Sequence, residues 1–208
     1  GACAFKTWPQ HDANLPQYDW IVIDHGDGFS YPQGVAVADG FVFAAGGASG
    51  TVVARNPLTN ASISQLVGDT GFGFGLFVSK TSVDGTPTAL WTYPVMSAGP
   101  SALVSDGTSL VFCGYFNGNA TFGTVTLQSA AQVDGSFDAF VVKMDTSGVV
   151  AWVKHFGSTA YDTTIHEAAI DDAGNVAVTG QRCAAACVGY VAVLAAQDGA
   201  VMWEAELA

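Results

Sequence analysis

Several short segments carry residue types that catalytic and metal sites use, but their spacing fails. The segment HEAAI at 166–170 begins like the zinc-protease motif H-E-x-x-H, yet Ile170 stands where the second histidine is required. The glycine-rich segment GFGFG at 71–75 lacks the G-x-G-x-x-G spacing, and no helical pattern follows it to bind phosphate. Nothing in the spacing of the four histidines selects a base. We therefore expect no catalytic residue and no enzyme activity.

Carboxylates at turns are the better candidates for binding chemistry. Oxygen ligands from turn residues suit Ca²⁺, although none of these segments has the D-x-D-x-D-G spacing. Hydrogen bonds from Asp and Asn side chains to the backbone of a turn explain the same residues without a metal. We expect no metal site and no cofactor, with Ca²⁺ as the alternative. The residues concerned are Asp24, Asp27, Asp134, Asp138, Asp171, Asp172 and Asn175.

Four cysteines bear on the redox environment. Cys183 and Cys187, in RCAAAC, are close enough to close a small loop, and no further Cys or His within the next turn supports a metal or redox pair. We predict a disulfide between them. Cys3 and Cys113 remain open: they could pair with each other or outside the chain, and Cys113 could be a buried thiol.

Charge and short motifs narrow the partners and the compartment. Eighteen acids against six bases give a net charge of −12, which argues against nucleic acid and against anionic membrane surfaces. No apolar run is long enough to span a bilayer. Asn60 and Asn119 begin N-x-S/T triplets, so we predict N-linked glycans there. The chain begins at Gly1 without a signal-peptide pattern, so we expect a processed, extracellular protein, secreted or at the cell surface.

One hairpin pattern recurs along the chain. In FVSKTSVDG, FVVKMDTSG and VAVLAAQDG, eight residues separate the first residue from the glycine (Gly85, Gly148 and Gly199). Each glycine precedes an apolar run with a tryptophan, namely Trp91, Trp152 and Trp203. Alternation followed by an Asp/Ser/Gly turn indicates a β-hairpin. The first and second copies carry Lys80 and Lys143, which this alignment places opposite Leu194 in the third.

A second hairpin precedes each of these. The segments 34–47, 101–114 and 167–180 read apolar strand, Asp-Gly-type turn, apolar strand and closing glycine. The unit is therefore four short antiparallel strands, as in a propeller blade. Nearly continuous apolar runs fit strands that are covered on both faces by neighbouring sheets, and half of the residues are hydrophobic.

The second unit resembles the β-propeller repeats of the SBBP type. The matching residues are NATFGTVTLQSA at 119–130, the run 138–157 and IDDAGNVAVTG at 170–180. The resemblance covers 101–182 well, 34–100 more loosely and 183–208 only in outline. It implies tandem blades in secreted or surface-exposed proteins, and it does not imply a catalytic apparatus.

We therefore predict an all-β, propeller-type array of four-stranded antiparallel blades in a single domain. The predicted parts are an N-terminal partial blade at 1–33, around Phe5 and Trp20, and blades at 34–100, 101–157 and 158–208. A closed ring needs about four blades, so this array should leave a sheet face open. The open face would meet further blades of a longer protein, a differently paired N-terminal segment or another copy of the chain.

The function expected from this pattern is structural or adhesive. The module would be non-catalytic, self-assembling into a filament or surface layer, or part of a larger surface protein. Its partners would then be other copies or adjacent blades. A carbohydrate- or ligand-binding propeller is the alternative, and a secreted hydrolase or lyase comes third.

Overall fold

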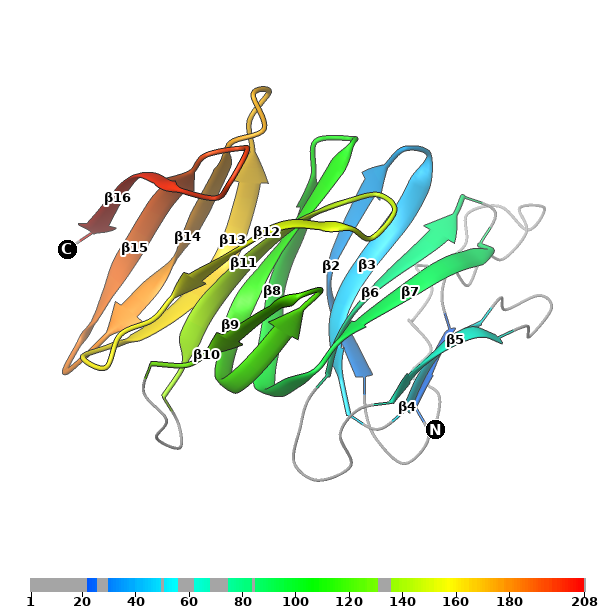
Figure 1. The fold of residues 1–208 in the computed structure, drawn as a ribbon, viewed down its shortest axis with the longest axis horizontal. Helices are drawn as coiled ribbons and strands as arrows, with labels where there is room; N and C mark the ends of the chain where they lie inside the picture. The colour runs from blue at the N-terminus through cyan, green and yellow to red at the C-terminus, as the bar shows by residue number, and fades with distance from the viewer. Residues whose placement is uncertain are drawn as a thin grey trace, which may run out of the picture.

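The computed structural model describes residues 22–25, 30–49, 51–55, 62–67, 75–83, 85–130 and 136–207. Within these ranges the regular elements are β-strands, and no residue is helical. Three antiparallel sheets lie face against face in a row, with β16 at one end and the sheet of β2 at the other (Figure 1). The all-β, sheet-stacked architecture is thus confirmed. The described sheets form an open row and no closed ring. Phe5 and Trp20 lie outside the described residues.

The first sheet has the order β2-β3-β6-β7. Asp39 and Gly40 connect its first two strands with φ angles of 48° and 74°, the left-handed conformation that a two-residue hairpin turn requires. Gly85, with a φ of 84°, lies in the turn before the last strand. The strands are β2 (Ser30–Ala38), β3 (Phe41–Ala48), β6 (Gly75–Ser82) and β7 (Pro87–Tyr93).

A small three-stranded sheet lies beside β7. It consists of β1 (Val22–His25), β4 (Thr51–Arg55) and β5 (Ser62–Val67), in the order β1-β4-β5. A strand from the predicted N-terminal part thus pairs with β4, which lies within the range assigned to the first blade.

The second sheet has the main order β9-β11-β12, with β8 and β10 both paired to the long strand β9. Its first strand starts at Val95, earlier than the boundary at 101. The segment 119–130, which resembles the repeat, forms the hairpin of β9 and β10, with Gly123 and Thr124 in its turn. The strands are β8 (Val95–Ser105), β9 (Ser109–Phe122), β10 (Val125–Gln128), β11 (Asp138–Asp145) and β12 (Val150–Phe156).

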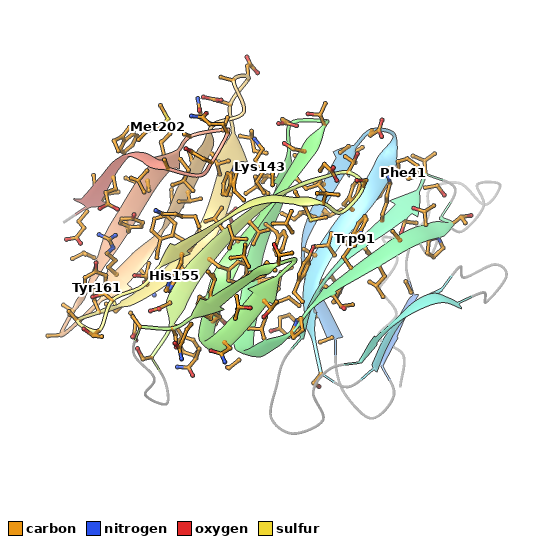
Figure 2. The ribbon with its side chains drawn as sticks, viewed as in Figure 1. Phe41, Trp91, Lys143, His155, Tyr161 and Met202 are labelled. Atoms are coloured by element: carbon orange, nitrogen blue, oxygen red, sulfur yellow. A yellow bond between two sulfur atoms is a disulfide. The ribbon has the colours of Figure 1, made fainter. Side chains whose placement is uncertain are left out.

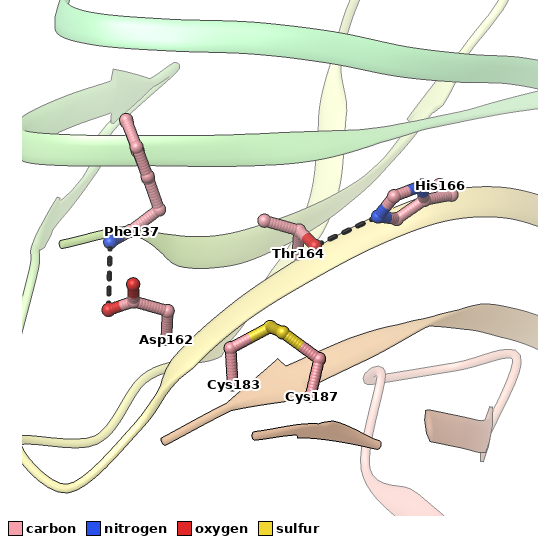
Figure 3. The surroundings of a disulfide bond; sticks show 6 residues. All are labelled: Phe137, Asp162, Thr164, His166, Cys183 and Cys187. Atoms are coloured by element: carbon pink, nitrogen blue, oxygen red, sulfur yellow. Dashed lines mark hydrogen bonds between the residues drawn. A yellow bond between two sulfur atoms is a disulfide. The ribbon is translucent and has the colours of Figure 1, made fainter. Parts of the chain in front are cut away.

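The third sheet is a four-stranded meander in the order β13-β14-β15-β16. Cys183 and Cys187 close the β14–β15 hairpin with a disulfide, on the strands seen in Figure 3. The strands are β13 (Asp162–Ile170), β14 (Val176–Cys183), β15 (Cys187–Leu194) and β16 (Val201–Leu207).

Two apolar layers join the three sheets. Between the first and second sheets, Phe43, Phe112 and Phe140 belong to one fully buried cluster. Between the second and third sheets, Trp152 and Tyr190 anchor the other cluster. Apolar area removed from water contributes about 25 cal/mol per Å², so these layers hold the row together. Both faces of β11, in the middle of the second sheet, are buried, as its nearly continuous apolar run predicts.

Candidate interaction surface

The two contacts between sheets share one arrangement. The indole of Trp91, on the last strand of the first sheet, occupies the space that a Cβ at Gly148 would need in the second sheet (Figure 2). The indole of Trp152 lies likewise on Gly199 of the third sheet, where a Cβ would come within 2.7 Å of the ring. Nε1 of Trp152 donates a hydrogen bond to the carbonyl of Ala196 at 3.0 Å. Each tryptophan therefore packs on the turn between the last two strands of the next sheet, which we call its outer hairpin.

Lysines reinforce both contacts. Nζ of Lys80 donates to the carbonyl of Thr146 at 2.9 Å, across to the second sheet. Nζ of Lys143 donates to the carbonyls of Gly174 at 2.9 Å and Ala196 at 3.4 Å, across to the third (Figure 2). A buried ammonium needs such acceptors, because losing water without them is costly. Lysine and tryptophan side chains therefore point toward the following sheet in both cases.

The third sheet corrects the alignment of these lysines. Gly46 pairs with Phe77 and Gly114 with Phe140, and the corresponding Gly180 pairs with Tyr190, not with Val191. The residue equivalent to Lys143 is therefore Val193, and the predicted alignment of Leu194 with Lys143 is wrong.

The cause lies in the turn. In the second sheet, the Asp145 amide donates a hydrogen bond to the Val149 carbonyl and closes the turn before the tryptophan strand. In the third sheet, the corresponding bond runs from the Ala195 amide to the Ala200 carbonyl, so this turn is one residue longer. A shift of one residue exchanges the two faces of a strand.

With this register, the outward face of the third sheet is uncovered. Trp203 pairs with Val193, as Trp152 pairs with Lys143, so it stands where the next sheet would be met. Its exposed fraction is 52%, against 7% for Trp152. Leu207, two alternations further along β16, is also exposed. Among the described residues, nothing packs on this face as the third sheet packs on the second.

Charge on β16 is directed away from the open face. Glu204 and Glu206 pair with strand β15 on the side of Tyr190, which faces the second sheet. Arg182 binds both carboxylates, at 3.1 and 3.3 Å, and its guanidinium lies over the ring of Tyr190. A hydrogen bond from Tyr190, together with Arg182, lowers the pKa of Glu204 despite partial burial. A sheet with one face in solvent normally carries polar residues on that face, whereas the outward face of β16 carries Trp203 and Leu207.

A histidine–carboxylate pair, which spacing could not reveal, lies at one corner of the second sheet. His155 Nε2 and Asp138 Oδ2 are 2.7 Å apart, and the Ala130 amide donates to the same oxygen at 2.6 Å. Asp138 is fully buried, and its Oδ1 has no hydrogen-bond partner among the described groups. Gly157 fits against both side chains, since a Cβ there would overlap them. The carboxylate can hold the imidazole in one orientation.

The turn carboxylates are occupied by their own turns. Asp171 accepts from the amides of Ala173 and Asn175 and from Nδ2 of Asn175. The Asn175 bonds lower the pKa of Asp171. Asp106 and Asp145 make similar turns, and in both the hydrogen bonds outweigh desolvation and lower the pKa. Within the described ranges, no group of three His, Cys, Asp or Glu residues could hold a metal.

The remaining predicted residues are scattered. Asn119 is exposed on β9, where a glycan could be attached. His166 contacts Thr164 on its own strand (Figure 3). Cys113 is free and buried between the second and third sheets, where desolvation raises its pKa to about 12. Some predicted residues lie outside the described ranges, namely Cys3, His11, Asp27, Asn60 and Asp134. The predicted pair of Asp24 and Asp27 is therefore described only at Asp24, on β1.

Comparison with known proteins yields no assignment. No family model matches the chain, and a search of curated proteins finds no match. In the part of the chain that the structure describes, no helix is long and apolar enough to cross a membrane.

Proposed function

We propose that this chain is an extracellular, non-catalytic structural or adhesive module of the β-propeller type, related to SBBP repeats. Its open third sheet docks a further β-sheet. The observation that carries the proposal is the contrast between Trp152 and Trp203, which hold the same position in successive sheets but differ in exposure, 7% against 52%. A large apolar surface in a fixed geometry is typical of an interaction site.

The extracellular setting is supported by the covalent chemistry. The Cys183–Cys187 disulfide fits an oxidising compartment. A glycan on exposed Asn119 would lie on the second sheet, away from the outward face of the third. The net charge of −12 favours solubility of such a module, while Trp203 and Leu207 supply apolar surface on its docking face.

The kind of surface that would fit follows from the two internal contacts. The receiving sheet offers an outer hairpin with a left-handed glycine and a carbonyl within reach of the indole Nε1, as Gly199 and Ala196 do for Trp152. Because Val193 replaces the lysine, the docking face has no ammonium to satisfy. The fourth sheet would therefore need fewer acceptors and more apolar area.

An extended chain tests this proposal. Residues 157–207 are repeated directly after Leu207, so that a fourth sheet follows through the same short connection. We expect a higher free energy of unfolding, and acrylamide should quench Trp203 less. The Trp203 contribution is isolated by subtracting a Trp203→Phe variant of each chain.

The matched control carries Val178→Asp in the appended copy only, which places a carboxylate on the face that must dock. That control should leave Trp203 as accessible as in the unextended chain. Equal quenching in all three chains would show that the third sheet does not dock a sheet of this kind.

A ligand-binding or hydrolytic role is the second candidate, favoured by the His155–Asp138 pair. Hydrolysis would need a nucleophile at the imidazole, since a carboxylate–histidine pair only orients the base. The assay is p-nitrophenyl acetate hydrolysis by the wild-type chain and by His155→Gln. We expect equal, uncatalysed rates, and a rate that depends on His155 would favour the enzyme.

A further inference from the structure

The first sheet, which lies at the opposite end of the row from β16 (Figure 1), carries a second exposed strip. Val35 pairs with Ala44, which lies two residues before the closing glycine Gly46. By the same count, Leu103 pairs with Phe112 before Gly114, and Ala168 with Val178 before Gly180. The three residues Val35, Leu103 and Ala168 therefore occupy equivalent positions, on the face that receives the preceding sheet.

Their environments differ in one respect. Leu103 is 4% exposed, because it packs on the first sheet beside Gly34. Ala168 packs against the cluster between the second and third sheets. Val35 is 68% exposed, and Val37, one alternation along the same strand, is 66% exposed. The strip formed by Val35 and Val37 thus has the position of a receiving surface, and among the described residues no sheet lies upon it.

The remainder of that face is already covered. Phe77, Ser79 and Thr81, on β6, point to the same side and are buried. The open strip itself lies on β2, the first strand of its sheet, and at Gly85, in the turn between β6 and β7, a Cβ would meet nothing within 4 Å.

We propose that a second copy of this chain occupies the open face, head to tail: β2 of one copy packs on the outward face of the third sheet of another. The proposal rests on the docking role argued above, and it names the partner. Both halves of the contact are present on one chain, they lie at opposite ends of the row, and they have the polarity of the two internal contacts. Such a contact does not close on itself, so it propagates into a filament.

The internal contacts indicate which strands meet. β13 lies on β8 and β9 of the preceding sheet, and β8 lies on β2 and β3. By continuity, β2 of a second copy lies on β13 and β14. The outward residues there include Ala169 and Ala177, small side chains against which Val35 and Val37 can pack, as Leu103 packs on Gly34.

Charge makes the contact dependent on salt. Copies with a net charge of −12 repel one another, and the exposed Glu167 lies on the outward face of β13, beside the small apolar residues proposed to meet Val35 and Val37. Added salt screens the repulsion and leaves apolar burial intact. Association should therefore strengthen with ionic strength, the reverse of a contact made by salt bridges.

Two variants and their mixture test the polarity. The head variant is Val35→Lys with Val37→Lys, and the tail variant is Ala169→Lys with Ala177→Lys. Lysine lowers the net negative charge, so lost association cannot be assigned to general repulsion. The control is Val125→Lys with Val149→Lys, two exposed valines on the second sheet.

Sedimentation velocity across a concentration series gives the readout. We expect wild type and control to associate, and each variant to associate at least about 100-fold more weakly because a charge is buried. An equimolar mixture of head and tail variants should form a dimer and nothing larger, through the one intact head and the one intact tail.

Other outcomes overturn the proposal. A wild-type chain that stays monomeric at every concentration and salt excludes the second copy as partner, and docking of a fourth sheet in the extended chain would still stand. A head variant that dimerises alone would show that two tails meet, which also contradicts the head-to-tail contact.

Discussion

Replacing Trp152 and Trp203 separately by alanine compares one structural position in a covered and in an open sheet. With exposed fractions of 7% and 52%, the two indoles are about nine-tenths and about half buried. A tryptophan buries about 200 Å², and at about 25 cal/mol per Å² the loss is about 5 kcal/mol for Trp152→Ala and about 2.5 kcal/mol for Trp203→Ala. Measured costs for buried aromatic residues, about 3–5 kcal/mol, agree with the larger value.

Urea unfolding followed by circular dichroism measures both losses. It should be done at the lowest workable protein concentration, so that contacts between copies add nothing to the stability. The expected difference in the free energy of unfolding is at least about 2 kcal/mol, with Trp152→Ala the less stable. Equal losses would refute the assignment of Trp203 to an open face, because they would require the two indoles to be equally covered.

Three further predictions follow from the turns. Gly199→Ala should cost more stability than Gly40→Ala, measured by urea midpoints. Both glycines have positive φ, but only at Gly199 does a Cβ also meet an indole, so equal costs would contradict the packing. Asp145→Asn should flatten the acid limb of the stability curve: hydrogen bonds outweigh desolvation and lower the folded pKa of Asp145, so its stabilisation is present above about pH 4 and is lost as the pH falls further. An unchanged limb would argue against that turn. Reducing the Cys183–Cys187 disulfide should cost at most about 2 kcal/mol, because the loop is short; a larger drop in the thermal midpoint would assign it a wider role.

The hairpins were predictable because their determinants are local. Gly40, Gly107 and Gly174 all have positive φ, at the Asp-Gly-type turns expected from the sequence. Gly148 and Gly199 do so in the outer hairpins, each ahead of a tryptophan strand. Alternation and turn residues act over a few positions, so one sequence is enough to read them.

The parts that sequence reasoning missed depend on pairing between distant residues. The sequence pattern wrongly predicts Leu194 at the lysine position, because counting back from Gly199 cannot detect a turn that is one residue longer. The His155–Asp138 pair joins residues on neighbouring strands through a side-chain contact that has no motif. The pairing of β1 with β4 also has no local signal.

The amino-acid pattern is enough to predict repeated antiparallel hairpins, the positions of their turns, and an apolar face at the end of a row of about three sheets. The tertiary structure alone decided which residues occupy that face, since strand faces alternate with every residue and a single added turn residue exchanges them. It therefore places Val193 and Trp203 on the open side of the third sheet, and Leu194 and Tyr190 in the core.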